Sequence, residues 1–152
     1  MDKPNTVYVT FIGSTPDRVW SLLTDADSSP QWFIGNRMDV GAAVGEPYRL
    51  YRPDGTIEVD GKELAIEPGR LLRVSWAMPE LPASRLENEV DFLIEDKGDG
   101  VVRLAVQEFH HEPIPEKWIE SGREGWSLIL ASVKTLLETG KPLPGIRMEP
   151  PE

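Results

Sequence analysis

The fold is decided by residues 86–110, which read LENEVDFLIEDKGDGVVRLAVQEFH. In the first part of this stretch two sets of residues alternate along the chain. The inner set is Leu86, Asn88, Val90, Phe92 and Ile94, and the outer, acidic set is Glu87, Glu89, Asp91 and Glu95. A period of two predicts an antiparallel strand whose inner face lies against the core and whose acidic face is solvated.

A hairpin loop, DKGDG at residues 96–100, leads from this strand into a return strand. The inner face of the return strand carries Val102, Leu104, Val106, Glu108 and His110. The period then changes. From about Glu116 to Thr139 apolar residues recur every three or four positions, which predicts an amphipathic helix that ends at Gly140. At about 1.5 Å per residue this helix is roughly 35 Å long, enough to cross a sheet.

The residues before this stretch predict strands and two short helices. Residues 6–12, TVYVTFI, have the β-branched and aromatic content of a strand, with apolar residues on both faces. Thr15-Pro16 starts a first helix, and Asp27-Ser28-Ser29-Pro30 starts a very short second helix that ends at Trp32-Phe33. Strand and turn signals follow, and a β-bulge is expected near Asp60-Gly61, where the apolar register shifts.

This order of elements indicates an α+β protein with an antiparallel sheet of six to seven strands. Bulges and glycines curve such a sheet. We therefore expect the C-terminal helix in its concave face, a cavity at one end, and the short helices as a lid. The length fits one domain, over residues 1–140, with a Pro-rich tail at 141–152.

Charge and composition narrow the function. The 152 residues carry a formal net charge of −10, which repels nucleic-acid phosphates and anionic lipids, so neither partner is expected. The absence of cysteine excludes disulfides and thiolate chemistry. The acidic and histidine residues at 108–112 lack metal-ligand spacing, and no cofactor is expected. The sequence has no signal-peptide pattern and no apolar run of about 20 residues, so we expect a cytoplasmic protein.

Four short segments between residues 6 and 140 carry a family resemblance. They are STPDRVW at 14–20, LLTD with QWF at 22–33, VDGKEL with IEP and LRVSW at 59–76, and GW with LLE at 125–138. In this order they resemble the START/Bet v 1-like (SRPBCC) superfamily, in the subfamily named for homology to the activator of heat shock protein 90 ATPase. The resemblance implies a helix-grip fold with a hydrophobic pocket, which in many members binds small apolar ligands. The family name also implies a link to the stress response.

The inward faces of these elements define a predicted pocket. Trp32 is expected at its rim, while Phe33 fits either the core or the pocket wall. Buried polar groups need partners, so Asn88, Glu108 and His110 are expected to pair with each other, with water or with a ligand. The candidate ligand-binding residues are Trp32, Phe33, Tyr48, Leu50, Trp76, Asn88, Val90, Phe92, Leu104, Val106, Glu108, His110, Trp126 and Ile129.

Three functions fit this pattern. The first is a binding protein, monomer or weak homodimer, that holds a small apolar or amphipathic molecule. The second is an enzyme of the cyclase, dehydratase or hydrolase type, with Glu108 or His110 as the general acid or base. The third is a module that contacts a chaperone ATPase through its acidic sheet face.

Overall fold

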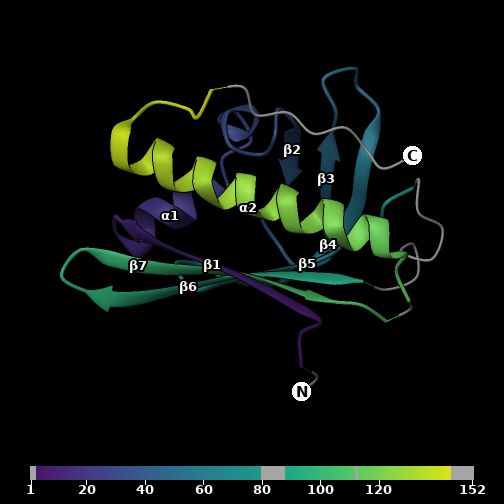
Figure 1. The fold of residues 1–152 in the computed structure, drawn as a ribbon, viewed down its shortest axis with the longest axis horizontal. Helices are drawn as coiled ribbons and strands as arrows, with labels where there is room; N and C mark the ends of the chain where they lie inside the picture. The colour runs from purple at the N-terminus through teal and green to yellow at the C-terminus, as the bar shows by residue number, and fades with distance from the viewer. Residues whose placement is uncertain (1–2, 80–87, 112, 145–152) are drawn as a thin grey trace.

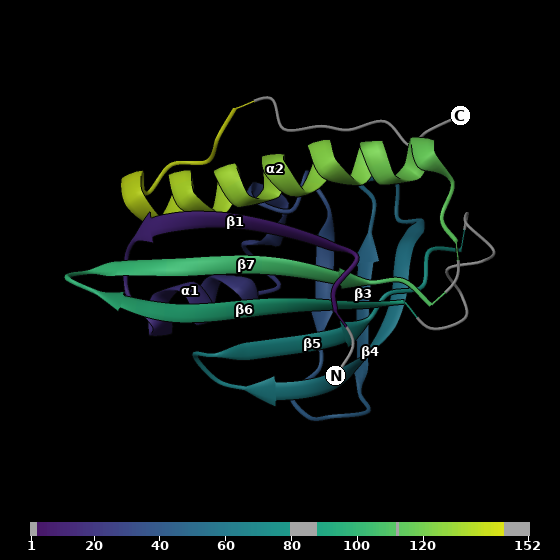
Figure 2. The same ribbon diagram turned by 60° about the horizontal axis from the view of Figure 1, so that its bottom comes forward.

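The computed structural model describes residues 3–79, 88–111 and 113–144. A seven-stranded antiparallel sheet, in the order β1-β7-β6-β5-β4-β3-β2, curls around a long helix α2, Glu116–Thr139 (Figure 1, Figure 2). The strands are β1 Thr6–Gly13, β2 Arg37–Val40, β3 Pro47–Tyr51, β4 Ile57–Glu67, β5 Leu71–Ser75, β6 Glu89–Gly98 and β7 Val101–Phe109. The expected α+β helix-grip architecture is therefore confirmed.

One helix and one short turn connect β1 to β2. Helix α1, Pro16–Leu23, begins as expected, because Thr15 Oγ1 accepts a hydrogen bond from the Arg18 N–H. The predicted second helix is only a 3₁₀ turn, η1, Ser29–Gln31. Ser29 Oγ accepts a hydrogen bond from the Met38 N–H at 2.9 Å, which ties this turn to the start of β2.

Helix α2 packs its apolar stripe into the concave face of the sheet (Figure 1). Its buried residues are Gly125, Trp126, Ile129, Leu130, Ser132 and Val133. The helix ends at Gly140, whose positive φ of 76° is a backbone conformation that glycine adopts without strain. The predicted tail lies outside the described residues from position 145 onward, and none of the described helices is long and apolar enough to cross a membrane.

The predicted inner face of the β6–β7 hairpin is buried along most of its length. On this face Val90 pairs with Glu108, and the next two inward-facing pairs, Phe92 with Val106 and Ile94 with Leu104, are apolar. The prediction of a fully solvated outer face is wrong at Asp91, which is only 3% exposed. Antiparallel pairing places Arg73 of β5 opposite Asp91, and the guanidinium donates two hydrogen bonds of 2.7 and 2.9 Å to the carboxylate. The predicted strand positions Leu86 and Glu87 lie outside the described residues.

Gly61 serves a different purpose from the one that the sequence indicated. The register shift of β4 against β5 lies between Glu63 and Ala65, not at Gly61. A Cβ atom on Gly61 would lie 1.9 Å from the backbone oxygen of Ser75, so a glycine is required for close approach of the two strands.

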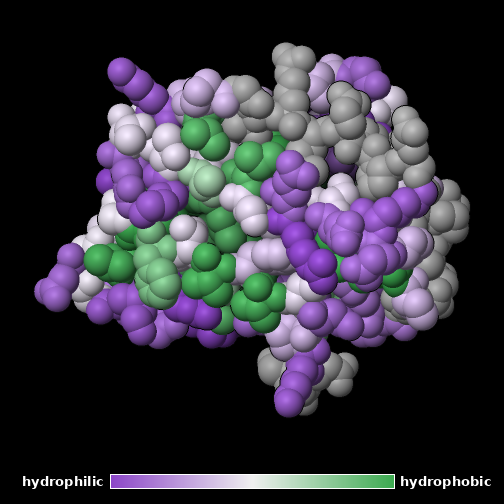
Figure 3. Space-filling model, in the orientation of Figure 1, coloured by the Kyte–Doolittle hydropathy of each residue, from purple (hydrophilic) through white to green (hydrophobic). Residues whose placement is uncertain are grey.

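β1 forms one edge of the sheet and exposes apolar side chains. Val7, Val9 and Phe11 are 46%, 40% and 51% exposed, and Figure 3 shows apolar surface along the course of β1. Two α2 side chains bind the backbone of this edge. Lys134 Nζ donates to the Phe11 carbonyl at 2.6 Å, and Glu138 accepts from the Gly13 N–H at 2.8 Å.

Candidate functional site: a pocket between the sheet and the first half of α2

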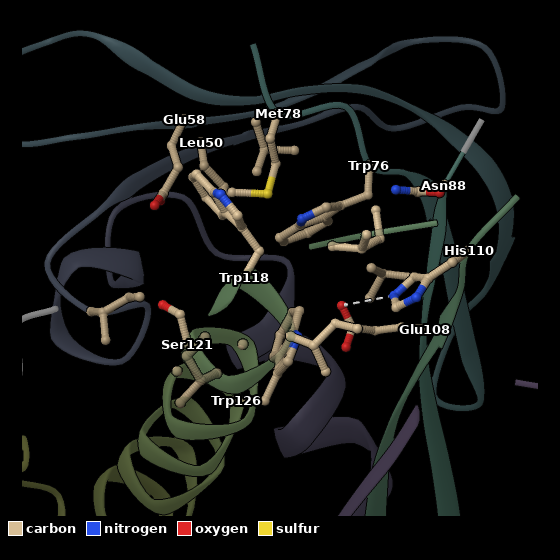
Figure 4. Close-up of a pocket in the computed structure, with 18 of the residues that line it drawn as sticks. Leu50, Glu58, Trp76, Met78, Asn88, Glu108, His110, Trp118, Ser121 and Trp126 are labelled. Carbon is tan, nitrogen blue, oxygen red and sulfur yellow. Dashed lines mark ion pairs between the residues drawn. The ribbon is translucent and has the colours of Figure 1, made fainter. Parts of the chain in front are cut away.

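A cavity of about 130 Å³ lies between the first half of α2, the concave face of the sheet and the segment after η1 (Figure 4). The described residues that line it are Phe33, Ile34, Leu50, Glu58, Val59, Trp76, Met78, Asn88, Glu89, Val90, Glu108, His110, Ile114, Trp118, Ile119, Ser121, Gly122, Gly125, Trp126 and Ile129. Most of this wall is aliphatic or aromatic, as is usual in pockets for small organic molecules.

Aromatic rings form a connected part of the wall. The ring centroids of Trp76 and Trp126 lie 5.3 Å apart, and Phe33 lies 6.4 Å from Trp76 and 6.2 Å from Trp126. These separations are within the range of attractive ring contacts. Trp118, one helical turn before Gly122, adds a further indole to the wall.

The ionisable side chains labelled in Figure 4 lie on two sides of this wall. Figure 4 shows Glu108 and His110 on one side of the view and Glu58 on the opposite side, with Trp76 and Trp126 between them. Glu58 accepts a hydrogen bond from the Asn36 side-chain amide. The pocket is therefore an apolar slot with an acidic group at either side.

Two acidic groups of this wall lie near a histidine, and of these Glu108 has the more buried side chain. It is 17% exposed, and its Oε1 accepts a hydrogen bond of 2.6 Å from Thr6 Oγ1. Its Oε2 lies 3.8 Å from His110 Nε2. Nearby, Glu89 lies 3.0 Å from His111 Nε2. A carboxylate and an imidazole on one wall have the chemistry to exchange a proton with a bound molecule.

Residues 14–138 match the family described as activator of Hsp90 ATPase homolog 1-like protein. The chain belongs to this family. No curated protein matches the sequence.

Solved structures share the fold of this family member. A protein from Mesorhizobium loti is 24% identical, with a TM-score of 0.73 over 88% of this chain and 97% of its own. The Aha1 dimer of Colwellia psychrerythraea is 23% identical, with a TM-score of 0.71 over 89% and 96%. An HSP90 activator from Plasmodium falciparum is 14% identical, with a TM-score of 0.71 over 88% and 95%. At these identities the likeness establishes the fold.

In this member of the activator homolog family, the structure brings nine of the predicted pocket residues onto one cavity wall. They are Phe33, Leu50, Trp76, Asn88, Val90, Glu108, His110, Trp126 and Ile129. They come from the segment after η1, from four strands or strand ends, and from α2. The alternation of β6 and β7 and the helical stripe of α2 therefore converge on the same space.

The structure places the other five predicted residues in the core and not on the pocket wall. They are Trp32, Tyr48, Phe92, Leu104 and Val106. Trp32 was expected at the rim, but it is fully buried and its ring stacks on Phe33 at 4.6 Å. The cavity lining includes the paired residues Val90 and Glu108 but not the next inward-facing pair, Phe92 and Val106. At the level of that second pair the Trp126 ring occupies the space and meets the Phe92 ring edge-on, with the ring centroids 5.8 Å apart.

Sequence reasoning missed several residues of the wall. Trp118 and Gly122 were detectable, because they share a helical face with Trp126 at spacings of four. Ile34 was not detectable. Its φ of 47° is rare for a β-branched residue, and Gly35 continues the positive-φ turn that brings Ile34 to the pocket.

A second buried acidic group, Glu63 of β4, is not among the residues that line the pocket. It is 0% exposed; its Oε1 accepts a hydrogen bond of 3.0 Å from the Gly41 N–H, and its Oε2 is buried without a hydrogen-bond partner. Burial, together with the nearby negative charge of Glu46, raises the pKa of Glu63 to about 7. Burial, and the charge of Glu63, also raise the pKa of the Tyr48 hydroxyl.

The parts of the chain that the structure describes hold no group of three or more His, Cys, Asp or Glu side chains arranged to bind a metal ion.

Proposed function

We propose that this protein binds a small, largely apolar molecule in the pocket beneath the first half of α2. The observation that carries this proposal is a cavity of about 130 Å³ with a mostly aliphatic and aromatic wall. An apolar cavity of about 150 Å³ is large enough to bind benzene, so one aromatic ring is a suitable occupant. Affinity would come from burial of apolar surface, and polar groups of the wall would orient the ligand.

The glycine at position 122 allows a sharp test. Gly122 lines the cavity, and a Cβ atom built on it would have nothing within 4 Å. Gly122 shares a face of α2 with Trp118 and Trp126, which also line the cavity, so a leucine at this position should project into the pocket, and its Cβ would meet no neighbouring atom. Leucine also has the higher helix propensity, by roughly 0.8 kcal/mol, so the helix should not be weakened.

The experiment is a titration with an environment-sensitive apolar dye, followed by dye fluorescence and by quenching of tryptophan fluorescence. We expect one dye per protein, and at least about a tenfold loss of affinity in Gly122→Leu, since the side chain displaces roughly one ring. Ala131→Leu is the matched control. It adds the same side chain at an exposed position of α2 and should leave dye affinity unchanged.

The ligand-binding proposal fails if Gly122→Leu binds the dye as tightly as the unmodified protein, with both proteins folded by circular dichroism. It also fails if Ala131→Leu loses affinity to the same extent, because the loss would then report a general effect of substitutions in α2 and not the filling of the pocket.

A second candidate function is contact with a chaperone ATPase, which the family assignment favours. Its test is ATP turnover by a purified heat shock protein 90 chaperone with and without this protein. We expect little stimulation. Stimulation that persists in Gly122→Leu would favour the chaperone role over ligand binding, because the filled pocket would then be irrelevant to the activity.

A further inference from the structure

We infer that the ligand of this pocket is a cation: an apolar amine whose ring occupies the cavity and whose ammonium group binds Glu108. This inference rests on the proposed ligand-binding function and adds the charge of the ligand to it.

The ionisable side chains of the wall have one predominant sign. Among the described residues, the pocket is lined by the carboxyl groups of Glu58, Glu89 and Glu108 and by one imidazole, His110, and by no lysine or arginine. A ligand carboxylate or phosphate would lack a permanent cationic partner in this wall and would face several acidic groups. An ammonium group would be attracted by all of them.

Glu108 is the acidic group that best fits the role of counter-ion. Glu89 already lies 3.0 Å from His111, and Glu58 is held by Asn36. Glu108 receives a hydrogen bond from Thr6 on Oε1, whereas its Oε2 is 3.8 Å from His110, beyond hydrogen-bond distance. In the described parts of the chain, no lysine or arginine forms an ion pair with Glu108. A mostly buried carboxylate gains most from a bound cation, because water solvates it poorly.

The aromatic rings of the wall favour the same ligand. Indole faces attract cations more strongly than phenyl faces do, and the attraction grows when the cation is desolvated. Trp76, Trp118 and Trp126 all line the cavity, and the first and last of these rings are 5.3 Å apart. A protonated amine beside Glu108 thus meets both a carboxylate and indole rings, whereas a neutral ligand uses only the apolar surface.

The test uses three ligands of matched shape: phenylbutylamine, phenylbutanol and phenylbutanoate, which are cationic, neutral and anionic at neutral pH. Each competes with the apolar dye on the unmodified protein. We expect the amine to bind at least about tenfold more tightly than the alcohol, as a desolvated charge pair or cation–π contact predicts. The alcohol should in turn bind more tightly than the carboxylate. Added salt should weaken only the amine.

Two variants locate the charge preference. Glu108→Gln should bring amine and alcohol to within about twofold of each other, with the larger loss of affinity falling on the amine. Glu89→Gln is the matched control. It removes a carboxylate from the same wall, but that carboxylate already has a histidine partner, His111. It should keep most of the preference for the amine.

The outcomes separate the two proposals. Equal binding of amine and alcohol, or tightest binding of the carboxylate, overturns the cation assignment while alcohol binding still supports the pocket. A full amine preference in folded Glu108→Gln overturns the role of Glu108. Failure of the dye and of all three ligands to bind overturns the pocket itself. The ligand series on unmodified protein decides the charge question even where Glu108→Gln does not fold.

Discussion

Replacing Glu63 by glutamine should stabilise the protein at neutral and alkaline pH and change the pH dependence of its stability. The pKa of Glu63 is raised from its ordinary value of 4.5 to about 7 in the folded chain. Between these two values the folded state binds more protons than the unfolded state. The free energy of unfolding therefore falls as pH rises through this window, and it levels off above the folded pKa.

The size of the effect follows from the shift. One pKa unit corresponds to about 1.4 kcal/mol, so a shift of this size lowers the free energy of unfolding by roughly 3 kcal/mol between acid and alkaline pH. A glutamine side chain resembles the protonated acid and keeps an oxygen that can accept from the Gly41 N–H. Its stability relative to the unmodified protein should thus increase by roughly 3 kcal/mol from about pH 4.5 to about pH 8.

Urea titrations monitored by tryptophan fluorescence, at several pH values in this range, measure the difference. Glu95→Gln is the matched control, since it makes the same chemical change at an exposed position of β6, and it should follow the unmodified protein to within about 0.5 kcal/mol. Parallel stability curves for Glu63→Gln and the unmodified protein would refute the reasoning, as would a difference that shrinks with rising pH.

Three further substitutions should lower the free energy of unfolding, which denaturant titration measures. Trp126→Ala should lower the free energy of unfolding by about 3–5 kcal/mol, because the ring is 4% exposed and packs against three others; a loss below about 1 kcal/mol would contradict its place in the core. Arg73→Met should cost about 3–5 kcal/mol by leaving Asp91 buried without its partner, and adding Asp91→Leu should recover much of that loss. Gly61→Ala should cost at least about 1–3 kcal/mol, since its Cβ meets the Ser75 backbone; an unchanged stability would show that β4 and β5 separate easily.

The fold was predictable where one period dominated a segment. The alternation in β6 and β7 and the helical stripe of α2 were unambiguous, so the hairpin between the two strands and the inner faces of all three elements followed. In β1 both faces are apolar, and the sequence could not show that Val7, Val9 and Phe11 are the exposed set. The burial of Asp91 was also hidden, because its partner is on a neighbouring strand and only the register brings the two together.

The sequence predicted which side chains of the site face inward, but not how far the cavity extends along the sheet. Periodicity shows which side chains face the helix, and it placed Glu108 and His110 on the correct face. It does not show where large side chains from the helix fill the space. Phe92 and Val106 face inward like Val90 and Glu108. Trp126 packs against Phe92, however, so the cavity is lined by Val90 and Glu108 and does not reach Phe92 and Val106. Only the packing of three elements sets the length of the pocket.

The contacts between the end of α2 and β1 have a consequence for self-association. An edge strand with apolar side chains and unpaired backbone groups is a template for β-sheet pairing with another copy of the chain. Lys134 and Glu138 occupy the backbone groups of Phe11 and Gly13 on that edge. The last turns of the helix thus hinder pairing of β1 with another chain. Shortening the chain before Lys134 would free the backbone groups beside Phe11, the most exposed of the three apolar side chains on this strand.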